Sequence, residues 1–123
     1  MAESVIPRSV ISCFTEFKSA SITGTYLTDG TIVYAICGKI MFFMARVKPK
    51  KAISTAIELV TVDSNDFTGF LYPIIYPVSE GTSSANTNSG KLAWTVSQTK
   101  QFRVTGQFQS GVNYYFGGCT MLV

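Results

Sequence analysis

Hydrophobic and polar positions alternate with a period of two along much of this chain, which is typical of β-strands with one buried face. In residues 101–109 the apolar side of the alternation is continuous. It consists of Phe102, Val104, Gly106 and Phe108. Residues 91–99 alternate in the same way around Leu92 and Trp94, so we expect the two stretches to pair. The only weak helical window, residues 50–59, lacks a 3.6-residue apolar repeat.

Residues 40–47 differ because both faces of the expected strand are apolar. Ile40 and Phe42 point one way, whereas Met41 and Phe43 point the other. We expect a central strand with one face in the core and the other in a subunit interface, and all four residues are interface candidates because parity does not assign the faces. The basic residues at its end (Arg46, Lys48, Lys50 and Lys51) suit a solvated strand end better than an anion site.

Turn signals divide the chain into short strands. Asp29-Gly30 predicts a tight turn between residues 22–27 and 31–37, and Gly111 predicts another. Pro73 and Pro77 favour an edge strand or extended loop between them. The small polar residues 79–90 predict an exposed loop. The pattern predicts one all-β domain over residues 1–123, an antiparallel β-sandwich, with residues 1–28 as an N-terminal strand and lead-in and residues 29–123 as the core of the domain.

Composition restricts the partners. The 123 residues are 46% hydrophobic and only 14% charged, which suggests surface hidden in an oligomer. A net charge of +3 is too small to argue for nucleic-acid binding, and the longest apolar stretch, residues 32–47, is short of the roughly 20 residues of a membrane-spanning helix. The N-terminus lacks the apolar run of a signal peptide.

The sequence contains few of the residues that catalysis or metal binding requires. Without histidine, the common activated nucleophiles lack their base, and Cys13, Cys37 and Cys119 form no usual zinc set. We expect buried reduced thiols, synthesis in a reducing compartment, no metal, no cofactor and no enzymatic activity. Asp63 and Asp66 are the only closely spaced acids, and their pattern favours a turn.

Aromatic residues are the more informative feature, because sugars are bound through contact of their C–H faces with aromatic rings and through oriented hydrogen bonds. Trp94 is a core residue or a ligand platform, and one of the adjacent Tyr114 and Tyr115 must face away from the core. The candidate saccharide contacts are Tyr72, Tyr76, Trp94, Tyr114, Tyr115, Asp63 and Asp66.

From Asp29 onward the order of features resembles the C-terminal head domain of tailed-phage receptor-binding, tail-fibre and baseplate proteins. The resemblance lies in the layout. A D-G turn precedes an apolar strand at 40–47, an extended segment at 57–77, a polar loop, the hairpin K-L-A-W-T-V-S-Q-T-K-Q-F-R-V-T-G and a terminal strand, N-Y-Y-F-G-G-C-T-M-L-V.

This resemblance implies a trimeric, jelly-roll-like head on the virion tail tip or baseplate, made in the host cytoplasm. Such heads bind polysaccharide of the host cell envelope, with no nucleic acid and no membrane insertion. The alternative is a structural virion module for baseplate assembly or capsid decoration, which contacts other tail proteins and no sugar. A third reading, a glycan hydrolase, depends on Asp63 and Asp66 alone.

Overall fold

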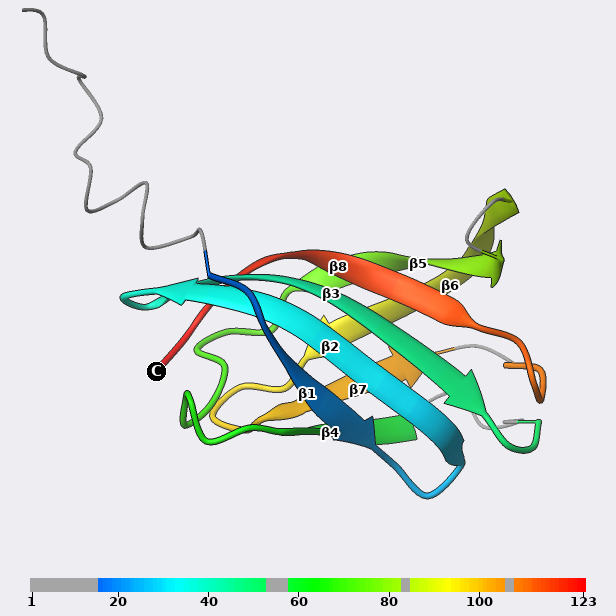
Figure 1. The fold of residues 1–123 in the computed structure, drawn as a ribbon, viewed down its shortest axis with the longest axis horizontal. Helices are drawn as coiled ribbons and strands as arrows, with labels where there is room; N and C mark the ends of the chain where they lie inside the picture. Colours follow the sequence, from blue (N-terminus) through cyan, green and yellow to red (C-terminus); the bar gives the residue numbers. More distant parts are fainter. Residues whose placement is uncertain (1–15, 53–57, 83–84, 106–107) are drawn as a thin grey trace, which may run out of the picture.

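The computed structural model describes residues 16–52, 58–82, 85–105 and 108–123, and within these ranges the chain forms eight antiparallel strands and no helix (Figure 1). The strands close into a barrel in the order β1-β2-β3-β8-β5-β6-β7-β4. They are β1 (Lys18–Thr23), β2 (Leu27–Cys37), β3 (Ile40–Pro49), β4 (Glu58–Asp63), β5 (Ile75–Thr82), β6 (Ala85–Thr95), β7 (Gln101–Thr105) and β8 (Tyr114–Met121).

The barrel consists of two Greek keys of identical connectivity. In the first, β4 returns to lie beside β1, which gives the spatial order 4-1-2-3; in the second, β8 returns to β5, which gives 8-5-6-7. Pairing of β3 with β8 and of β7 with β4 joins the two keys. The all-β, antiparallel prediction is therefore confirmed, but the two-sheet sandwich is wrong. Strands of a barrel and of a sandwich share the same alternation, so the pattern does not reveal that the sheet closes.

Aromatic rings dominate the interior. Phe43 on β3 packs edge-on to Tyr76 on β5 with ring centroids 5.1 Å apart, and its ring lies 5.3 Å from that of Phe102 on β7. Phe102 also packs against Phe116 and against Phe70, which comes from the segment after β4. Contacts of this kind connect strands from both Greek keys in one continuous core.

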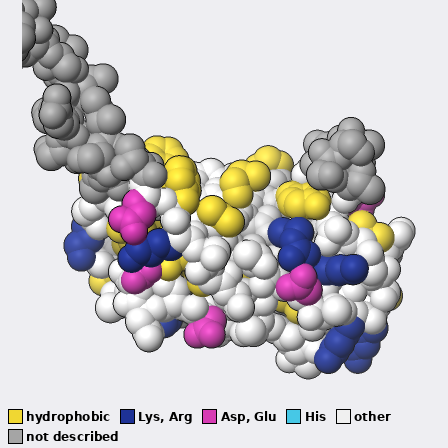
Figure 2. Space-filling view, in the orientation of Figure 1, with side chains coloured by type: hydrophobic (Ala, Val, Ile, Leu, Met, Phe, Trp, Pro, Cys, Tyr) yellow, Lys and Arg dark blue, Asp and Glu magenta, His cyan; other side chains and the backbone are white. Residues whose placement is uncertain are grey.

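The burial of its side chains shows which face of the doubly apolar strand β3 lies in the core. Met41 and Phe43 point into the barrel and are buried, whereas Ile40, Phe42 and Met44 point outward, with Met44 60% exposed. The core thus uses one face of β3, and only the face of Ile40 and Phe42 remains available as an interface. Hydrophobic side chains gather where β3 and β8 lie, along the upper margin of Figure 2.

Three local predictions are wrong. Asp29 and Gly30 form no turn but lie within β2, beside an irregularity in its register with β3. The polar stretch 79–90 is no open loop, because Ser79 to Thr82 pair with Asn88 to Ala85 in a long hairpin between β5 and β6. β7 comprises Gln101–Thr105, residues 106 and 107 of the expected strand lie outside the described residues, and Gln109 belongs to no strand; the expected pairing of β7 with β6 is confirmed.

Proline and cysteine positions also have structural explanations. Pro77 lies in β5 opposite Leu92 on β6, and the pairing of β5 with β8 begins only at Ser79, so the missing N–H of Pro77 leaves no ladder bond unmade. Cys119 is free, as expected, but exposed instead of buried. Cys37 is disulfide-bonded, so the expectation of a reduced thiol is wrong there, and Cys13 lies outside the described residues. No helix among the described residues is long and apolar enough to span a membrane.

The basic end of β3 is largely solvated, as expected. Lys50 and Lys51 are exposed, and the Nζ of Lys51 lies 4.4 Å from the centre of the Tyr26 ring. Arg46 donates to Asp29 Oδ2 at 2.8 Å. The charges of this segment are thus partly satisfied within the protein.

Candidate functional site

The best-formed polar site surrounds Tyr34, an inward-facing residue of β2 that is only 3% exposed. A buried phenol requires a hydrogen-bond partner. The Tyr34 hydroxyl donates to the carboxylate of Asp66, and it lies 2.8 Å from the hydroxyl of Ser64. Both partners come from the segment that follows β4, so the hydroxyl ties this segment to the barrel wall.

The position of Asp66 is fixed by further hydrogen bonds in the same segment. Its backbone N–H donates to Ser64 Oγ at 3.1 Å, an arrangement that serine commonly makes in turns. Lys100 donates from Nζ to the carbonyl of Ser64 at 2.7 Å, which anchors the segment to the loop between β6 and β7. The carboxylate is therefore held in a defined place although the residue is exposed.

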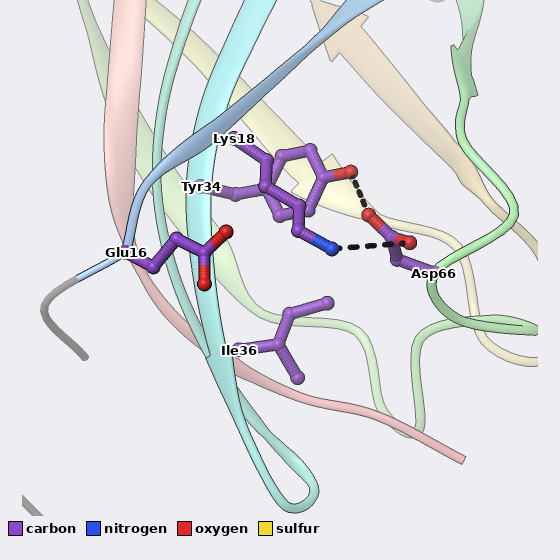
Figure 3. Close-up of a pocket in the computed structure, with 5 residues that line it drawn as sticks. All are labelled: Glu16, Lys18, Tyr34, Ile36 and Asp66. Atoms are coloured by element: carbon purple, nitrogen blue, oxygen red, sulfur yellow. Dashed lines mark hydrogen bonds and ion pairs between the residues drawn. The ribbon is translucent and has the colours of Figure 1, made fainter. Parts of the chain in front are cut away.

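A pocket opens beside this pair (Figure 3). Lys18, at the start of β1, extends across it and places Nζ 3.7 Å from Asp66 Oδ1. Glu16 and Ile36 line the remaining walls, and the cavity volume is about 250 Å³. This is slightly below the roughly 300 to 1,000 Å³ of sites for drug-sized ligands, so the pocket suits one small polar group or a single sugar ring.

The electrostatics of the pocket follow from these contacts. The hydrogen bond from Tyr34, assisted by the charge of Lys18, lowers the pKa of Asp66. Burial, together with the hydrogen bond to Asp66, raises the pKa of Tyr34. Around neutral pH the pocket thus holds the two carboxylates of Asp66 and Glu16, the ammonium group of Lys18 and the neutral phenol of Tyr34. A carboxyl with a lowered pKa is a poor general acid, but it is a good acceptor for ligand hydroxyl groups.

The other residues expected to bind a saccharide are dispersed over the barrel. Tyr76 is buried and donates from its hydroxyl to the carbonyl of Cys119 at 2.8 Å. Tyr114 is also buried, and its hydroxyl accepts from the Gln109 N–H at 2.8 Å. Burial raises the pKa of both phenols. Asp63, at the end of β4 opposite Ser21, is exposed and does not line the pocket.

Three of the expected aromatic residues face outward. Trp94 is half-buried on the outer face of β6, which favours the platform over the core interpretation, and Tyr72 is 62% exposed. Tyr115 is the outward member of the adjacent pair, as expected, and it lies opposite Arg46 on β3. Of the seven candidates, only Asp66 lies in the pocket.

Sequence reasoning missed Glu16, Lys18, Tyr34 and Ile36. Tyr34 alone carried a usable signal, because a tyrosine at an inward position of a strand must find a partner for its hydroxyl. Lys18 reaches the pocket through pairing of β1 with β2, which places it opposite Tyr34, and Glu16 lies just before β1. Ile36 lies two residues along β2 from Tyr34, on the same face. Among the described residues, no cluster of three or more metal-binding side chains occurs.

Comparison of the chain with protein-family models, with curated proteins and with solved structures finds no match.

Proposed function

We propose that this chain is a non-enzymatic, saccharide-binding head domain of a tailed-phage receptor-binding or baseplate protein, with the Tyr34 pocket as its sugar site. The observation that carries the proposal is the Asp66 carboxylate, which is fixed by Tyr34 and has a lowered pKa. Fixed carboxylates accept hydrogen bonds from vicinal hydroxyl groups, and Ile36 supplies an apolar wall beside them.

Binding of host-envelope polysaccharide tests this proposal. Intact protein should bind at least one envelope polysaccharide on a glycan array, and Asp66→Asn should weaken binding on the order of tenfold, since one charge-assisted hydrogen bond is lost. Asp63→Asn is the matched control, because the same chemical change is made three residues away and outside the pocket. Failure of the intact protein to bind any envelope sugar contradicts the proposal, as does equal loss of binding in both variants.

A second candidate, a virion assembly module, is favoured by the apolar outer face of β2, β3 and β8. This face consists of Val33, Ile40, Phe42, Met44 and Met121. Exposed apolar residues grouped on one face commonly mark a protein interface, and a homotrimer or another tail protein would bury them. The mass in solution and capture of disassembled virion proteins test this role. A monomer that captures no virion component contradicts it.

A further inference from the structure

A single row of side chains crosses the four adjacent strands β5, β6, β7 and β4, on the side of the barrel away from β2 and β3. Ile75 on β5 is opposite Trp94 on β6, Trp94 is opposite Arg103 on β7, and Arg103 is opposite Leu59 on β4. Directly opposed residues on one face of an antiparallel pair lie roughly 5 Å apart at Cβ. The four residues therefore form a continuous strip.

The strip faces outward. The residues that flank it along the same strands point inward and are buried; they are Tyr76, Ala93, Phe102, Val104 and Val60. Ile75 is 64% and Leu59 is 40% exposed, while Trp94 and Arg103 are half-buried. The indole thus lies in the surface, flanked by an aliphatic side chain on one side and a guanidinium on the other.

The guanidinium of Arg103 lacks a counter-ion within the part of the chain that the structure describes. Among the described residues its guanidinium makes neither a hydrogen bond nor an ion pair. Arg46, the other arginine of the described barrel, is bound by Asp29 and Asn113. A partly desolvated cation without a partner is unfavourable unless an anion approaches it. The surroundings of Arg103 are therefore complementary to a negatively charged ligand.

We propose that this strip binds an acidic saccharide, with a sugar ring on the Trp94 face and its carboxylate or phosphate on Arg103. The assignment rests on the proposed function and adds a second saccharide site to it, with the chemical class of the ligand that this second site takes. Indole faces contact the C–H faces of sugars, and a guanidinium can bind carboxylate or phosphate through two parallel hydrogen bonds. Because Trp94 and Arg103 are at opposed positions, one monosaccharide unit can reach both.

A nucleic acid offers the same two chemistries, stacking and negative charge, but the strip suits it less. Single-stranded nucleic acids bind in grooves with several cations that follow the backbone. Arg103 is the only cation of the strip, and the whole chain carries a net charge of only +3. The strip pairs one cation, Arg103, with one aromatic ring, that of Trp94. This arrangement fits a polymer with one acidic group per sugar unit.

This strip is separate from the Tyr34 pocket. β4 provides a common scale for the two sites. Ser21 on β1 is opposite Asp63, and Lys18 lies three residues further along β1, past the end of β4. Arg103 is opposite Leu59, which lies four residues before Asp63. At about 3.3 Å per residue the two sites are roughly 20 Å apart along the strand direction. Substitutions in one site should therefore leave the other intact.

Titration with defined polymers tests the assignment. The probes are polygalacturonate, which carries carboxylates, phosphomannan, which carries phosphates, neutral dextran and an oligothymidylate. We expect binding to at least one acidic polymer. Arg103→Gln and Trp94→Ala should each reduce its affinity on the order of tenfold, and added salt should weaken binding. Arg46→Gln is the matched control, since its guanidinium is already paired. Asp66→Asn is titrated alongside it to report on the Tyr34 pocket.

The outcomes separate the two proposals. Unchanged affinity in Arg103→Gln and Trp94→Ala, with loss in Asp66→Asn, overturns the strip assignment and leaves the pocket as the sugar site. Binding of dextran but of neither acidic polymer also overturns the strip assignment. Tighter binding of oligothymidylate than of the acidic polymers, with the same dependence on Arg103, overturns the ligand class. Absence of binding to every saccharide overturns both proposals. Unchanged circular dichroism and melting temperature show that each variant is folded.

Discussion

Tyr34 and Asp66 lie 32 positions apart in the sequence and are joined by a hydrogen bond from the phenol to the carboxylate. The pair connects an inward residue of β2 with the segment after β4, and it defines one wall of the pocket. Each partner shifts the pKa of the other away from neutral pH. The consequence is a polar contact whose charge state is constant over the physiological range and changes only in strong acid or strong alkali.

The difference in unfolding free energy between the Asp66→Asn variant and the wild type should disappear in acid. The pKa of Asp66 is lowered from its ordinary value of 3.8, so ionised Asp66 stabilises the fold above pH 3.8, and this contribution is lost as the pH falls through the lower pKa of the folded state. At neutral pH the variant should therefore be less stable. Urea unfolding from pH 2 to 7 measures the difference, and parallel curves for the two proteins would contradict the role of the carboxylate.

In alkali, Tyr34→Phe should flatten the decline of stability. Burial raises the pKa of Tyr34 above 10.0, so its stabilising contribution is present below pH 10 and is lost as the pH rises through the higher pKa of the folded state. Tyr76 and Tyr114 also have raised pKa values, so part of the slope should remain. At neutral pH the variant should lose about 1 to 2 kcal/mol through its missing hydrogen bonds. An unchanged alkaline slope would show that Tyr34 contributes nothing to it.

Neighbouring residues of β3 should respond very differently to truncation. Phe43→Ala removes a ring that contacts Tyr76, Phe102 and Phe116, and it should cost about 3 to 5 kcal/mol of unfolding free energy. Met44→Ala, one position along and outward, should cost about 1 kcal/mol or less. Chemical denaturation of both variants gives the comparison. Similar losses in the two would mean that β3 is not oriented as described.

Gly117→Ala should destabilise the seam between β3 and β8. A β-carbon at this position would lie 2.5 Å from the carbonyl oxygen of Phe43 and 2.5 Å from the sulfur of Met44. The methionine side chain can move, but the backbone oxygen cannot, so we expect a loss of about 1 to 3 kcal/mol. Cys119→Ala, two positions along the same strand and exposed, is the control. A thermal melt in which both variants match the wild type would contradict the close approach of the strands.

Short-range patterns predicted the strands well. The alternation of residues 91–99 and 101–109 identified β6, β7 and their pairing, and the double apolar pattern of residues 40–47 identified β3. Errors arose where local residue preferences are overridden by pairing. Asp29-Gly30 has the composition of a turn, yet it lies in β2 opposite Lys48 and Val47, and the polar stretch 79–90 is held by hydrogen bonds between β5 and β6.

The candidate pocket was much less predictable than the strands. Asp66 was singled out because of its neighbour Asp63, but the structure pairs it with Tyr34 and Lys18 from strands far away in sequence. Side chains meet there because the first Greek key returns β4 to β1, and no local pattern encodes this return. For Trp94, alternation gave the strand correctly but not the face, because residues 91–99 contain apolar side chains on both faces.

The position of β8 between β3 and β5 has a consequence for synthesis of the chain. β8 is the last strand of the barrel, and it pairs with residues 40–47, far upstream. Before residues 114–121 leave the ribosome, β3 has an unpaired edge, and the Phe43 and Phe102 rings lack their neighbour Phe116. The barrel therefore cannot close until residues 114–121 have been synthesised, and the nascent chain exposes the edge of β3 until then.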